Sequence, residues 1–150
     1  MSQTDLLSRS DVPLSDNEQR AQPKRARSLR VLIADDDRDT VLTLAMVLRD
    51  EGHEVHGVYN GSDVLRAVRQ FAPHAVVVDI NMPDLSGYDV ARAIRTRNRN
   101  VLLIAISGVY KRDPDKLLAA VVGFDHFLPK PYHASDVLKL LEPLQTPGEH

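Results

Sequence analysis

Five apolar segments of strand length alternate along the chain with five segments of helical periodicity. The strand segments at 75–79 and 101–106 are almost entirely apolar and rich in β-branched residues, which is typical of strands buried on both faces. An alternation of this kind predicts an α/β fold in which helices cover both sides of a parallel sheet. We therefore expect a (βα)5 unit with a doubly wound, five-stranded parallel sheet and right-handed crossovers.

Each helical segment carries an apolar stripe that identifies its expected core face. Gly52, Pro73 and Gly123 follow three of these segments and predict where the helices end. Four arginines between 92 and 99 crowd the end of the third segment, where the helix dipole favours cations. In chain order, the residues expected to face the core are Val41, Leu44, Ala45 and Leu48; Val64, Leu65, Val68 and Phe71; Val90, Ala93 and Ile94; Leu117, Leu118, Val121 and Val122; and Val137, Leu140, Leu141 and Leu144.

Composition excludes several classes of protein. The chain has 150 residues, enough for one ordinary domain, and a formal net charge of -2, so no basic field predicts nucleic acid as a partner. It contains no cysteine, which removes disulfide and zinc-thiolate chemistry and fits a cytoplasmic protein. There is neither a signal peptide nor an apolar run approaching ~18 residues, so we expect no secretion and no membrane partner.

Residues 1–28 are polar, lack apolar periodicity and are expected to form a disordered N-terminal tail. Four basic residues at the end of this stretch favour a solvated linker, with contact to an acidic partner or nucleic acid as the alternative: Lys24, Arg25, Arg27 and Arg30. The ordered domain is expected at 29–144, and residues 145–150 are expected to form a short C-terminal tail.

Polar side chains follow several of the predicted strands directly. In an open parallel sheet, ligands bind outside the carboxyl ends of the strands, where the strand order reverses. With the flavodoxin-like order 2-1-3-4-5, one crevice would gather the five polar residues that end or follow strands one, three, four and five: Asp35, Asp36, Asp79, Ser107 and Lys130. We take Asp37 as solvent-facing and as a candidate N-cap for the helix that follows.

Three carboxylates in one crevice raise one another's pKa values unless a cation compensates them. Oxygen ligands without His or Cys nearby favour Mg²⁺, or Mn²⁺, over zinc. In such a site Asp79 could act as a nucleophile that forms an acyl phosphate, with Lys130 and Ser107 contacting phosphoryl oxygens. Taken singly, Asp79 could instead be a turn residue and Lys130 a solvated lysine.

At these positions the sequence resembles the receiver domain of two-component response regulators, specifically a stand-alone, chemotaxis-regulator-like receiver. The resemblance covers about residues 29–144. It depends on the acidic pair after the first strand, on Asp79 followed by Asn81-Met82-Pro83 and Gly87, on Ser107, and on Lys130-Pro131.

The resemblance implies a role for each site residue. Asp79 would accept the phosphoryl group and would ligate Mg²⁺ together with Asp36, with Asp35 mostly through water, and with the backbone carbonyl of Asn81. Ser107 and Lys130 would bind the phosphoryl group. Phe127 would be the switch aromatic, and the bond before Pro131 is a candidate cis peptide.

From this we expect a single-domain phosphoacceptor that takes its phosphoryl group from a phosphohistidine of a sensor kinase or phosphotransfer protein. It would signal through a protein partner at about 113–144 or through onward transfer, and would catalyse only its own phosphorylation and slow autodephosphorylation. The alternative is a receiver-like adaptor that works without phosphorylation. A phosphohydrolase would need an acid where Asn81 stands.

Overall fold

Five parallel strands form one sheet in the order β2-β1-β3-β4-β5, which confirms the predicted topology. The structure is a computed structural model that describes residues 27–108 and 113–146. The strands are β1 (Arg30–Ala34), β2 (Glu54–Val58), β3 (Ala75–Asp79), β4 (Leu102–Ser107) and β5 (His126–Pro129). The helices are α2 (Arg38–Asp50), α3 (Gly61–Phe71), α4 (Gly87–Arg97), α5 (Asp113–Val122) and α6 (Ala134–Leu141), followed by a 3-10 turn, Glu142–Gln145.

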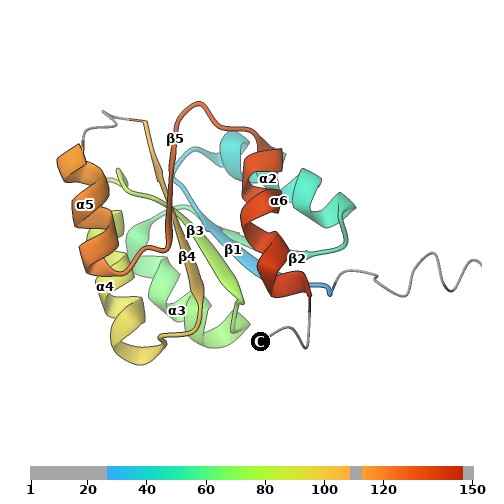
Figure 1. Ribbon diagram of the computed structural model, residues 1–150, viewed down its shortest axis with the longest axis horizontal. Coiled ribbons are helices and arrows are strands. Elements are labelled where there is room, and N and C mark those ends of the chain that lie inside the picture. The colour runs from blue at the N-terminus through green and yellow to red at the C-terminus, as the bar shows by residue number, and fades with distance from the viewer. Residues whose placement is uncertain (1–26, 109–112, 147–150) are drawn as a thin grey trace, which may run out of the picture. The chain divides into compact units, whose positions relative to one another are not determined.

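Helices cover both faces of the sheet, with α2 and α6 on one side and α3, α4 and α5 on the other (Figure 1). Because successive side chains of a strand point to opposite faces, β1 supplies Val31 and Ile33 to the α2/α6 core and Leu32 to the other. All five residues of β3 are buried. This explains why its sequence is a continuous apolar run rather than an alternating one.

Helix boundaries follow local sequence signals. Asp37 caps α2, since its side chain accepts from the amide of Asp39, and Gly52 follows the helix with φ 97°. Its exposed side chain confirms that Asp37 faces solvent. Asn60 caps α3 and Ser86 caps α4 in the same way.

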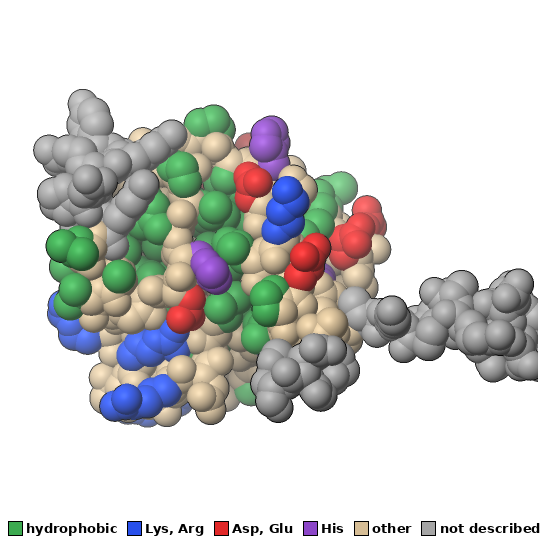
Figure 2. All heavy atoms as spheres, viewed as in Figure 1, with side chains coloured by type: hydrophobic (Ala, Val, Ile, Leu, Met, Phe, Trp, Pro, Cys, Tyr) green, Lys and Arg blue, Asp and Glu red, His purple; other side chains and the backbone are tan. Residues whose placement is uncertain are grey.

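The expected core face of α5 is wrong at three of its four residues and correct at Val122. Leu117 (68% exposed), Leu118 (44%) and Val121 (77%) lie at the surface, while Ala119 and Val122 are buried. Apolar side chains are visible at the surface on the side where α5 lies (Figure 2). The helix is apolar around most of its circumference, so its sequence does not specify which stripe faces the sheet.

Smaller differences concern three other helices. In α3, Leu65, Val68 and Phe71 are only half-buried, while Val64 is buried as predicted and Ala67 is buried as well. In α4, Ala91 is buried in place of the predicted Ala93, which is half-buried. In α6 and the turn after it, Leu140 and Leu144 are only half-buried, beside the buried Val137 and Leu141. Among the described residues, no helix combines the length and apolar character needed to cross a bilayer.

Candidate functional site

The strand register brings the ends of β1, β3 and β4 to one edge of the sheet. Ala34 pairs with Val78, so Asp35 and Asp79 follow as neighbours on adjacent strands. Asp79 in turn pairs with Ile106, next to Ser107. Parallel strands therefore place these polar residues at the same rim, as the sequence pattern predicts.

Three carboxylates converge at this rim. One oxygen each of Asp35, Asp36 and Asp79 lies within 4.8 Å of the others. Asp35 and Asp79 are buried, with 3% and 4% exposure, whereas Asp36 is exposed. Two carboxylates of the cluster are thus buried and one faces solvent. This arrangement suits a cation that keeps part of its water shell.

Lys130 brings the opposite charge to the cluster. Its Nζ donates to Asp79 Oδ2 at 3.0 Å and lies 3.8 Å from Asp35 Oδ2. The backbone holds the residue in register, because the Lys130 amide donates to the Ser107 carbonyl at 2.8 Å. The peptide between Lys130 and Pro131 is cis. A Cβ at Gly108 would lie 3.1 Å from Lys130 Cδ, so a glycine there leaves room for the lysine stem.

The cluster holds three carboxylates and one lysine, and this excess of negative charge affects the pKa values of its members. Burial and the nearby charge of Asp79 raise the pKa of Asp35 to about 6, although the Asp37 amide and Lys130 act in the other direction. Burial lowers the pKa of Lys130, but the hydrogen bond to Asp79 and the charge of Asp35 outweigh it and raise that pKa. Burial, Asp35 and Asp79 also raise the pKa of Tyr132 to about 12.

One lysine therefore does not neutralise the cluster. A divalent cation with oxygen ligands would do so, and the donor set of three carboxylates without Cys or His fits Mg²⁺ or Mn²⁺.

The loop after β3 begins at the cluster. The amide of Asn81 donates to Asp79 Oδ1 at 2.9 Å, and the amide of Gly87 donates to the Ile80 carbonyl at 2.9 Å. A Cβ at Gly87 would lie 2.7 Å from Ile80 Cα, so this position requires glycine. The loop is thus folded back on the end of β3, with Asn81 beside Asp79.

Ser107 and Phe127 lie at different depths. Ser107 is buried at the end of β4, next to the cluster. Phe127 is half-buried on β5 opposite Ala105, two residues further from the rim, and packs against the core on the α3/α4/α5 side. The structure therefore places Ser107 at the rim and Phe127 behind it.

The sequence did not indicate the contact made by Asp84, in the loop that begins at the cluster. Its carboxylate accepts from the amides of Gly61 and Ser62 at the start of α3. Asn60 caps the same helix locally, and nothing in the sequence of the loop points to a contact with residues more than 20 positions earlier.

Comparison with known proteins gives one consistent result. Residues 31–142 match the family described as "Response regulator receiver domain". The chain is 34% identical over 117 residues to the transcriptional regulatory protein PrrA of Mycobacterium tuberculosis, covering 78% of this chain and 50% of that protein. It is 29% identical over 110 residues to the cell cycle transcriptional regulator CtrA of Caulobacter vibrioides, covering 73% and 47%. The chain spans about half the length of these curated relatives.

Solved structures agree. The BeF3-activated DrrB receiver domain superposes with a TM-score of 0.71 at 25% identity, covering 78% of this chain and 97% of that one. The chemotaxis response regulator CheY4 of Vibrio cholerae superposes with a TM-score of 0.73 at 22% identity, covering 79% and 99%. The second likeness concerns the fold alone.

Proposed function

The chain belongs to the response regulator receiver domain family of two-component systems, and on this premise we propose that Asp79 is its phosphoacceptor. The observation that carries the proposal is the set of charged side chains that surrounds this carboxylate. Lys130 Nζ lies 3.0 Å from Asp79 Oδ2, and oxygens of Asp35, Asp36 and Asp79 lie within 4.8 Å of one another. A turn residue would need neither the lysine nor the other two carboxylates.

The reaction is a phosphoryl transfer from a phosphohistidine. A carboxylate oxygen of Asp79 attacks phosphorus, the P–N bond breaks, and the imidazole nitrogen keeps the electron pair and takes up a proton. Lys130, which pairs with Asp79 at rest, is in position to hold a phosphoryl oxygen, and the Ser107 hydroxyl can donate to another. Mg²⁺, when held by Asp35, Asp36, Asp79 and the Asn81 carbonyl, would supply positive charge against the phosphoryl oxygens.

The donor that fits this chemistry is a sensor histidine kinase or a histidine phosphotransfer protein, which would meet the domain in the cytoplasm. A signal would leave through residues 113–144, by contact with a protein partner or by onward transfer. The exposed apolar side chains of Leu117, Leu118 and Val121 on α5 support a contact surface there. Movement of Ser107 toward the phosphoryl group, with Phe127 behind it, would couple the site to that surface.

The test is labelling by a small phosphodonor. Incubation of the full chain with acetyl phosphate and Mg²⁺ should add one phosphoryl group, seen by intact mass, and the addition should vanish in Asp79→Asn or without Mg²⁺. Asp37→Asn is the matched control, because it removes an adjacent carboxylate and Asn is an equally good cap. Labelling that persists in Asp79→Asn contradicts the assignment, and unlabelled wild type favours the phosphorylation-independent adaptor.

A further inference from the structure

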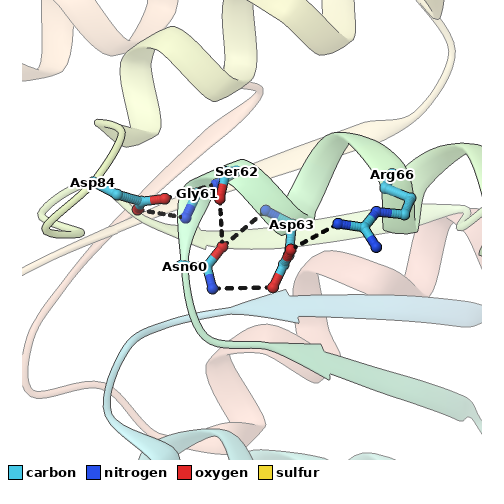
Figure 3. Close-up of polar contacts among 6 residues, drawn as sticks. All are labelled: Asn60, Gly61, Ser62, Asp63, Arg66 and Asp84. Atoms are coloured by element: carbon cyan, nitrogen blue, oxygen red, sulfur yellow. Dashed lines mark hydrogen bonds and ion pairs between the residues drawn. The ribbon is translucent and has the colours of Figure 1, made fainter.

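The loop between β3 and α4, residues 80–86, contacts the start of α3. Asp84 Oδ1 accepts from the Gly61 amide at 2.8 Å, and Asp84 Oδ2 accepts from the Ser62 amide at 3.0 Å (Figure 3). These are the first two amides of the helix, which have no acceptor within the helix itself. One carboxylate from another segment therefore completes this helix end.

Neither the N-cap residue Asn60 nor the side chains of the first turn of α3 accept hydrogen bonds from these two amides. Asn60 Oδ1 accepts from the Asp63 amide at 2.8 Å and from the Ser62 hydroxyl at 2.9 Å, and Asp63 pairs with Arg66 (Figure 3). The local cap thus serves the third amide and leaves the first two to Asp84. The hydrogen bonds from the Gly61 and Ser62 amides also hold the pKa of Asp84 below its usual value, so it is ionised at neutral pH.

The backbone is close enough to make this contact specific. A Cβ at Gly61 would lie 2.6 Å from Leu85 Cβ and 2.8 Å from the Leu85 carbonyl oxygen. Glycine at 61 therefore allows the second half of the loop, at Leu85, to lie against the helix end. The two ends of the loop are held elsewhere, by the hydrogen bond between Gly87 and Ile80 and by that between Asn81 and Asp79.

We propose that Asp84 is a positioning residue for the metal and phosphoryl site, because it ties the loop that carries the Asn81 carbonyl to α3. The inference rests on the proposed function, in which that carbonyl is a Mg²⁺ ligand. Asp84 follows Asn81 by three residues, so movement of the loop at Asp84 displaces the carbonyl through a short stretch of backbone. Loss of the tie weakens Mg²⁺ binding without removing a ligand.

The experiment compares two caps of the same helix. Asp84→Ala removes the cap that also ties the loop, whereas Asn60→Ala removes a cap and leaves the tie intact. Calorimetric titration of the full chain with Mg²⁺ should give a Kd raised about tenfold in Asp84→Ala, the low end for residues that position metal ligands. Asn60→Ala should stay within about twofold of wild type, since it touches no ligand. Asp84→Asn, with one acceptor oxygen left, should fall between wild type and Asp84→Ala.

Two further readouts separate positioning from loss of fold. At saturating Mg²⁺ the initial labelling rate of Asp84→Ala should return to that of wild type, because no reacting group is missing. In Mg²⁺-free protein, amide hydrogen exchange in the loop 80–86 should quicken in Asp84→Ala and not in Asn60→Ala.

Unchanged Mg²⁺ affinity in Asp84→Ala overturns the inference. So does an equal loss in Asn60→Ala, which would assign the effect to weakening of α3. Wild type that binds Mg²⁺ without being labelled contradicts the proposed function alone, since the affinities of the variants still judge the tie. Wild type that binds no Mg²⁺ contradicts both.

Discussion

At the scale of single residues, Asp35 is held in the least favourable environment for a charge. It is buried, lies beside Asp79, and has a pKa raised to about 6. A carboxyl with a higher pKa in the folded chain than in the unfolded one binds its proton more tightly when folded. Asp35 therefore contributes stability at low pH, and this contribution is lost as the pH rises through about 6.

We predict that Asp35→Asn stabilises the Mg²⁺-free protein at neutral pH. The shift from 3.8 to about 6 corresponds to about 3 kcal/mol at most, and the gain should fade as the pH drops from about 7 to about 4. Urea unfolding of both proteins across this range measures the difference. Burial lowers the pKa of His53 and acts with the opposite sign, but this effect is common to both proteins and cancels. A difference that does not change with pH would contradict the prediction.

The gathering of Asp35, Asp36, Asp79 and Lys130 could be predicted from the sequence, because each follows or ends a strand and parallel strands end at one edge. The contact between Asp84 and Gly61 could not, since it joins a loop to the first residue of a helix 23 positions earlier in the chain. A residue close in sequence could have capped the start of α3 instead. Long-range capping leaves no periodic signal in a sequence.

At the scale of elements, strands were easier to predict than helix faces. A central strand covered on both faces is apolar up to the rim of the sheet, so β3 and β4, each apolar except for its last residue, were clear. The arginines ending α4 suggested only a dipole effect, yet Arg95 donates to the carbonyls of Gly123 and Val101 and pairs with Asp125. It thereby links α4 to the segments before β4 and β5. Such a role depends on which helices meet, which periodicity does not specify.

The corrected face of α5 predicts opposite outcomes for two adjacent valines. Val122 is 6% exposed and Val121 is 77% exposed. Val122→Ala should cost about 1 to 3 kcal/mol through lost burial and a cavity, whereas Val121→Ala should stay within about 0.5 kcal/mol. Both substitutions have the same intrinsic effect on helix propensity, so their difference reports packing. Urea unfolding midpoints measure it, and equal costs would contradict this orientation of α5.

At the scale of the whole molecule, the sheet divides the domain into two cores and leaves the charged cluster at one edge. The raised pKa of the buried Asp35 means that its charge costs folding free energy at neutral pH, and a bound cation would offset that cost, so the site and the stability of the domain are coupled. The fold was predictable because alternating periods of strand and helix permit few topologies. The coupling follows from the same topology, since the strands that build the cores also carry the carboxylates.

Mg²⁺ should therefore stabilise the entire domain. A ligand that binds only the folded state adds about 2.7 kcal/mol when present at 100 times its Kd. The thermal unfolding midpoint of wild type should rise with Mg²⁺ concentration, and Asp36→Asn should lose most of this rise. Asp36 is an exposed member of the cluster, so its replacement leaves the cores intact. Asp39→Asn, which changes an exposed carboxylate in the first turn of α2, is the matched control. An equal rise in the midpoint of Asp36→Asn and wild type would mean that the cation binds elsewhere. A rise that is lost in Asp36→Asn but kept in Asp39→Asn would link the stability of both cores to this one edge of the sheet.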